Sequence, residues 1–132
     1  MSPNTVLMFV NGQAMTGGSL NDVLSSARFV GPVRTAPRYH FLSFDDVFPG
    51  LAQIAEGGRS VPGEIYEVSY TELREKLLPR EPAELELSVI ELEDGRGALS
   101  MVCRTLPSGD DSTREITAPG GWREHLASAA TT

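Results

Sequence analysis

The chain has 132 residues, of which 40% are hydrophobic and 22% are charged, a size and composition typical of one folded domain. Its 18 acidic and 11 basic residues give a formal charge of −7, which repels a phosphate backbone and argues against nucleic acid as a partner. The single cysteine, Cys103, allows no internal disulfide, and no segment approaches the ~20 apolar residues of a membrane span. We therefore expect a cytoplasmic, single-domain protein over residues 1–132, with no membrane partner and with frayed ends at 1–4 and 128–132.

The N-terminal part predicts a strand, a glycine loop and a short helix. Residues 6–10, "VLMFV", are continuously apolar and predict a central strand buried on both faces. Glycines at 12, 17 and 18 follow, and they let successive backbone N–H groups converge on an anion, although such a loop can equally be a plain turn. Residues 19–26, "SLNDVLSS", then predict a helix of about two turns with Ser19 as its N-cap and with Leu20, Val23 and Leu24 on one face.

Four short segments follow, up to residue 68. Residues 29–33 and 39–44 alternate as strands do, and Pro32 and Pro37 place them at edges or bulges. Residues 45–50 predict a turn, whereas 51–58 and 62–68 predict two further strands.

A helix is predicted with particular clarity at residues 70–77. Ser69 is followed three residues later by Glu72, which forms a capping box. Tyr70, Leu73 and Leu77 give the helix an apolar stripe. Pro79 and Pro82 are expected to end this helix, and Pro82 forces the residue before it, Glu81, into an extended backbone conformation.

The C-terminal part predicts a hairpin, a loop and a helix. Alternating Leu85, Leu87 and Val89 form the first strand, Asp94–Gly95 the turn, and 99–104 the return strand. Residues 105–116 are expected to be an acidic loop, and a helix is expected from about 121, with Trp122 packing as a plug. The sum is an α+β protein with a small mixed or antiparallel β-barrel and short flanking helices.

Few side chains are placed for catalysis. His40 and His125 lie far apart with no ligand-type neighbours, so we expect no metal site. Cys103 follows apolar strand residues, where a thiol is usually buried and inert. Glu81 is held rigidly by its proline, which suits a general base, although a solvated loop glutamate fits the same pattern. Glutamates 64 and 67 are expected to be half-exposed strand residues.

Four segments in order, "FVNGQAMTGGSLN", "TAPRYHFLSFDDVFPGL", "VPGEIYEVSYTELREKLLPREP" and "ITAPGGWREHL", resemble the gamma-glutamylcyclotransferase-like family. The resemblance is closest to the branch that includes the C-terminal domain of allophanate hydrolase, and it extends from residue 6 to residue 126. It implies a backbone-amide cradle in the loop after the first strand, which binds the carboxylate and carbonyl of the substrate. The matching positions are Asn11, Gly12, Gln13, Ala14 and Met15.

The resemblance also places the catalytic glutamate of the family at Glu81, where it would take a proton from the amine of the substrate, with no cofactor. Two positions depart from the usual Y-G-S-L loop, since Asn11 replaces Tyr and Gln13 replaces Ser. A third, Ala14, stands where the allophanate hydrolase branch has a histidine, which weakens a decarboxylating role.

Two functions remain open. The first is a cyclotransferase-like enzyme (a transferase or lyase) that acts on a small carboxylated amide of the gamma-glutamyl amine type and releases 5-oxoproline. The alternative is a non-catalytic module that binds a small ligand or supports oligomerisation as the companion of an amidase. The resemblance leaves open whether the chain forms a homodimer.

Overall fold

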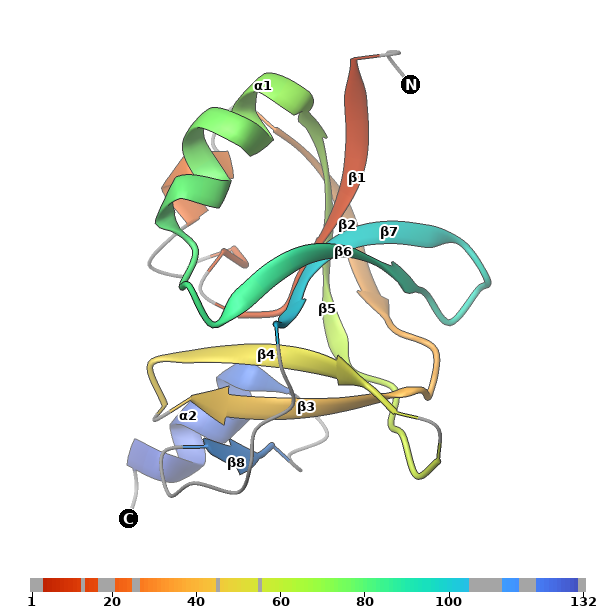
Figure 1. Ribbon diagram of the computed structural model, residues 1–132, viewed down its shortest axis with the longest axis vertical. Helices are drawn as coiled ribbons and strands as arrows, with labels where there is room; N and C mark the ends of the chain where they lie inside the picture. Colours follow the sequence, from red (N-terminus) through yellow and green to blue (C-terminus); the bar gives the residue numbers. More distant parts are fainter. Residues whose placement is uncertain are drawn as a thin grey trace.

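Eight strands and a few short helical segments make up the part of the chain that the structure describes (Figure 1). The computed structural model describes residues 4–12, 14–16, 21–24, 27–44, 46–54, 56–104, 113–116 and 121–130. The strands are β1 (Thr5–Val10), β2 (Arg28–Arg34), β3 (Tyr39–Phe44), β4 (Phe48–Gln53), β5 (Pro62–Ser69), β6 (Leu85–Glu91), β7 (Gly97–Cys103) and β8 (Thr113–Glu115). The helical segments are η1 (Asn21–Leu24), α1 (Tyr70–Glu72), η2 (Leu73–Leu77), η3 (Leu78–Arg80) and α2 (Trp122–Ala130).

All eight strands belong to one mixed sheet in the order β2-β5-β1-β7-β4-β3-β8, with β6 paired to β7. The pairs β1·β7 and β4·β7 are parallel, and the others are antiparallel. A single bridge from Thr35 to Leu92 links the ends of β2 and β6, but no continuous ladder between these two strands closes a ring within the described residues. The predicted α+β class with a mixed sheet is therefore confirmed, and the sheet is bent without being a closed barrel.

The first strand forms as its sequence predicts. β1 lies between β5 and β7 in the sheet, and its last three residues are fully buried. The predicted edge strand with a bulge is also present, since β2 pairs only with β5 in the strand order and its register shifts between Phe29 and Gly31.

Three predicted elements need correction. Residues 45–50 were expected to form a turn, but β4 already begins at Phe48, because residues 48–53 pair along the whole of β3. The helix after the glycine loop is a single 3-10 turn, η1, and its expected cap at 19 lies outside the described residues. The expected acidic loop is likewise described only from 113, where residues 113–115 form β8 against β3.

The helical segment before Glu81 is continuous but irregular. Ser69 caps it as predicted, since its hydroxyl accepts a hydrogen bond from the Glu72 backbone N–H at 3.1 Å. The segment widens to a π-helical turn at Leu73–Leu77 and then tightens to a 3-10 turn that runs through Pro79 to Arg80. The helix therefore continues past the first proline, which occupies an N-terminal position of the 3-10 turn, where a missing N–H costs little.

The core lies between the sheet and the helical segments. Leu73 and Leu77 are buried in it as predicted, but Tyr70, at the start of α1, is exposed, so the predicted apolar stripe is shorter than expected. Leu85 and Ile90 of β6 are buried whereas Val89 is exposed, so the expected alternation of that strand is kept only at its start. The hairpin turn is confirmed, with Gly95 at φ 90°.

The helical segment that begins with α1 and the C-terminal helix α2 lie at opposite ends of the molecule (Figure 1). Trp122 on α2 is buried in the core, as expected for a packing role. Its ring stacks on that of His125, with the ring centroids 6.0 Å apart. Among the described residues, no helix combines the length and the hydrophobicity that a membrane span needs.

Candidate active site

The sheet separates at one point and leaves a cavity there. Along β7, Leu99 is in register with Met8 of β1, whereas Val102 is in register with Leu51 of β4. Between these two positions β7 passes from one parallel neighbour to the other. A cavity of about 30 Å³ lies at this change of partner, and Ser100 of β7 lines it. We refer to it as the β7 cavity.

The walls of the β7 cavity come from segments that are far apart in the sequence. The end of β1 and the loop after it supply one side, the start of β4 supplies another, and β6, β7 and Glu81 complete it. Gly12 lies so close to β4 that a Cβ atom there would be 2.6 Å from Cγ and Cδ of Pro49. Only glycine fits this approach without displacement, and this explains the pivotal glycine of the loop.

Glu81 lies in this cavity, and its local backbone explains why. The residue has φ −82° and ψ 147°, the extended conformation that a following proline imposes. Its N–H closes the last turn on Leu78 O at 3.1 Å, so the side chain leaves the helical segment at a fixed point. Glu81 is therefore no solvated loop residue, since it lines the same cavity as Gly12.

Burial raises the pKa of the Glu81 carboxyl to about 7. In the part of the chain that the structure describes, this carboxyl has no hydrogen bond or ion pair that would favour its charged form. A carboxyl with a pKa near neutrality can both accept and return a proton at pH 7, which is the property of a general acid/base.

Two further polar side chains line the β7 cavity without partners. Asn11 Nδ2 and Ser100 Oγ are buried and make no hydrogen bond to any described residue. Asn11 is 8% exposed and Ser100 is 1% exposed. Buried polar groups are nearly always paired in native proteins, so these two atoms call for a partner from outside the described residues, either an ordered water or a ligand.

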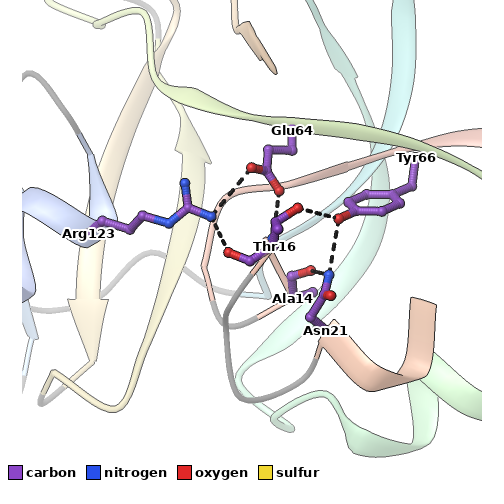
Figure 2. Close-up of polar contacts among 6 residues, drawn as sticks. All are labelled: Ala14, Thr16, Asn21, Glu64, Tyr66 and Arg123. Carbon is purple, nitrogen blue, oxygen red and sulfur yellow. Dashed lines mark hydrogen bonds and ion pairs between the residues drawn. The ribbon is translucent and has the colours of Figure 1, made fainter. Parts of the chain in front are cut away.

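On its other side the loop after β1 is fixed by a buried carboxylate (Figure 2). Glu64 of β5 accepts a hydrogen bond from the Thr16 N–H at 2.7 Å and is ion-paired with Arg123 of α2 at 3.4 Å. Arg123 also donates to the Thr16 carbonyl oxygen. We call Glu64, Thr16 and Arg123 the loop clamp. Glu64 was expected to be half-exposed but is buried, because this clamp covers it.

Hydroxyl and amide groups hold the next part of the loop (Figure 2). The hydroxyl groups of Thr16 and Tyr66 are 2.7 Å apart, and Asn21 Nδ2 donates to the Tyr66 hydroxyl and to the Ala14 carbonyl oxygen. The N–H of Met15 donates to Gly12 O at 3.1 Å. The amides of residues 15 and 16 are therefore already used within the protein, which restricts any backbone-amide cradle to the residues before them.

The structure brings together most of the residues that the sequence proposes for the site. Asn11, Gly12, Ala14 and Glu81 line the β7 cavity. Met15 is buried in the core and is not among the residues that line it. Gln13 lies outside the described residues.

The other chemically reactive side chains have ordinary surroundings. The Nε2 atom of His125 lies 2.7 Å from Oδ1 of Asp46, and Nε2 of His40 lies 4.0 Å from Oε1 of Glu115. Burial raises the pKa of the Cys103 thiol to about 11, so this thiol is almost entirely protonated at neutral pH. Within the described ranges, no three histidine, cysteine or acidic side chains form a group that could hold a metal ion.

Sequence reasoning missed Ser100 and the loop clamp. Ser100 stands alone as a polar residue within the apolar strand segment "ALSMVC", a pattern that signals a buried hydroxyl. Glu64 similarly lies next to the apolar pair Ile65–Tyr66 in a strand, where a glutamate must find a partner if both faces are covered.

Comparison with known proteins gives the same fold and a family. A family model described as the allophanate hydrolase C-terminal domain matches residues 6–127. The crystal structure of c4763, a uropathogenic E. coli-specific protein, superposes with a TM-score of 0.84 at 35% identity and covers 96% of this chain and 98% of that one. No curated protein was found to match the sequence.

Two further structures place the chain more broadly. Allophanate hydrolase of Kluyveromyces lactis superposes with a TM-score of 0.86 at 25% identity, over 96% of this chain but only 22% of the enzyme. An AIG2-like protein from mouse superposes with a TM-score of 0.64 at 22% identity, over 80% of this chain and 81% of that one, and shows the fold alone.

The fold is thus gamma-glutamylcyclotransferase-like, as the sequence predicts. Within that class, the chain belongs to the allophanate hydrolase C-terminal domain family.

Proposed function

We propose that the chain is a gamma-glutamylcyclotransferase-like enzyme that acts on a small carboxylated amide, with Glu81 as general acid/base. One observation supports this most strongly: Glu81 lines the same cavity as the glycine loop, and burial there raises its pKa to about 7. An enzyme that moves protons at neutral pH needs a group with this pKa within reach of its substrate.

The reaction can be written for a gamma-glutamyl amine. The substrate reacts with its α-amine in the neutral form, and ionised Glu81 takes one proton from that nitrogen as the nitrogen attacks the γ-carbonyl carbon. The new C–N bond closes the ring, and donors that line the β7 cavity stabilise the negative oxygen. The intermediate then collapses, the original C–N bond breaks, and Glu81 returns the proton to the leaving amine. The products are 5-oxoproline and the free amine, and no metal takes part in these steps.

The cavity limits how much of a substrate it can enclose. Its volume of about 30 Å³ is small for a whole gamma-glutamyl amine. The reacting group of the substrate therefore enters the β7 cavity, and the rest of the substrate lies outside it.

Replacing Glu81 tests this function. Glu81→Gln keeps the shape of the side chain and removes its basicity, so release of 5-oxoproline from gamma-glutamyl amines should fall by about 10²- to 10⁴-fold. Glu84→Gln is the matched control, because Glu84 is an exposed glutamate in the next turn and should retain full activity. Turnover that survives Glu81→Gln contradicts the proposed role.

A second candidate function is a non-catalytic companion of an amidase. The observation that favours it is the match to one part of K. lactis allophanate hydrolase, of which this chain covers 22%. Ala14 also lines the cavity at the position where the branch has a histidine, which removes an imidazole from the site. Stable co-purification with an amidase encoded by a neighbouring gene, together with no turnover of any gamma-glutamyl amine, would favour this candidate.

A further inference from the structure

The unpaired polar atoms of the β7 cavity define what it binds. Asn11 Nδ2 is a hydrogen-bond donor, and the Ser100 hydroxyl can donate or accept. Both residues are more than nine-tenths buried, and neither atom has a partner among the described residues. Leaving such groups unpaired costs stability, and a ligand that offers hydrogen-bond acceptors would remove this cost.

The position of Ser100 follows from the sheet. It lies between Leu99, which is in register with β1, and Val102, which is in register with β4. Ser100 lines the cavity next to this change of partner. Asn11 is the first residue after β1 and lines the same cavity.

The charges that line the cavity disfavour a carboxylate. Among the described residues that line it, none is positively charged, and Glu81 is the single acid. A ligand carboxylate in this space would meet an ionised or half-ionised Glu81 with no cation to offset the repulsion. A neutral carboxamide avoids this cost: its carbonyl oxygen accepts from Asn11 and Ser100, and its N–H donates to the Glu81 carboxylate.

We propose that the β7 cavity binds the neutral amide group of the substrate, with Asn11 and Ser100 as donors to its carbonyl oxygen, while the carboxylate of the substrate stays outside. This inference deepens the proposed function and rests on it for the identity of the substrate. It assigns Ser100 to the binding site and gives Asn11 a role through its side chain.

Simple probes separate the amide from the carboxylate. Acetamide and acetate have nearly the same shape, and binding of each at pH 8.5 can be followed by two-dimensional amide NMR of the full chain. We expect acetamide to shift the resonances of residues around the β7 cavity, and acetate to bind at least about tenfold more weakly. Equal or tighter binding of acetate at this pH overturns the inference.

Variants of the two donors supply the second test. Ser100→Ala and Asn11→Leu should each weaken acetamide binding by about fivefold, the value of one hydrogen bond, and should lower kcat for the amide substrate. Thermal stability should be unchanged or higher in both, because each removes an unpaired buried group. Ser88→Ala is the matched control, since Ser88 is in register with Ser100 on β6 but is exposed.

These outcomes distinguish the inference from the proposed function. If Glu81→Gln abolishes turnover while Ser100→Ala and Asn11→Leu leave it unchanged, the inference is wrong and the proposed function is still supported. If acetamide binding depends on both donors but no substrate is turned over, the binding role is supported and the proposed enzymatic function is contradicted. A loss of folding in one variant leaves the test to the other, which has a different position in the sheet.

Discussion

Two glutamates near the loop after β1, the buried Glu64 and the half-buried Glu81, have opposite surroundings. Glu64 contacts a backbone N–H with one carboxylate oxygen and a guanidinium with the other. Among the described residues Glu81 has neither kind of contact, and burial raises its pKa to about 7. The same type of side chain is thus used to fix the loop at one position and is left available to a ligand at the other.

The difference shows how a small domain can use one carboxylate for structure and keep another available for proton transfer. A buried acid with a donor for each oxygen stabilises its surroundings and has no capacity left for a substrate. A buried acid without donors reduces stability when it ionises, and this cost is retained where proton transfer needs it. Four predictions test the contrast, starting with the largest expected effect.

Stability should depend on pH through Glu81. The pKa of this carboxyl is raised from 4.5 to about 7 in the folded protein, so the folded state holds the proton more tightly than the unfolded state. Its contribution is fully present below pH 4.5 and is lost as the pH rises through 7, by up to about 3 kcal/mol.

Urea unfolding of the wild type and Glu81→Gln at pH 4 and pH 8.5 measures this contribution. The variant should match the wild type at pH 4 and exceed it at pH 8.5, with Glu84→Gln as control. Parallel pH curves for the two proteins would show that Glu81 is not a buried, unpaired acid.

Gly12→Ala should disturb the packing of the loop after β1 against β4, at the edge of the β7 cavity. The added Cβ would lie 2.6 Å from two atoms of the Pro49 ring, so loop or strand must move, at a cost of about 2 kcal/mol. Gly97→Ala is the control, because its Cβ would meet nothing closer than 3.7 Å. The free energy of unfolding and acetamide binding should both fall for Gly12→Ala alone, and equal effects of the two changes would contradict the close packing.

Glu64→Gln should loosen the loop clamp without touching Glu81. The amide can still accept from Thr16 but loses the charge that pairs with Arg123, whose side chain is half-exposed. We expect a loss of about 1–1.5 kcal/mol. A double-mutant cycle with Arg123→Ala isolates the pair, and a coupling energy indistinguishable from zero would show that the clamp does not depend on it.

Ser69→Ala should have the smallest effect. It removes the side-chain cap of the segment that leads to Glu81, at a cost of about 1 kcal/mol. The change should lower turnover more than the clamp variants of equal stability do, because it acts on the segment that positions the general base. Equal turnover losses in the two sets would mean that stability alone controls activity.

Local sequence rules predicted the elements that depend on neighbours along the chain. The apolar run of β1, the cap at Ser69, the extended Glu81 before its proline and the turn at Gly95 all follow from residues within a few positions. The resemblance then placed Glu81 beside the glycine loop, and the shared cavity agrees with that placement.

The missed features depend on pairing between distant segments. Ser100 lines the cavity where β7 changes its parallel neighbour, and the partner of the buried Glu64, Arg123, comes from the other end of the chain. Residues 113–115 form a strand because the edge of β3 is available to them. No local pattern contains this information.

The separation of β1 and β4 along β7 has a further consequence for how such a site can change. The hollow is made by the paths of three main chains and by one residue that lacks a side chain, so it persists when the surrounding side chains are exchanged. Substitutions at positions 11, 14 and 100 can alter which molecule is recognised while the sheet stays as it is.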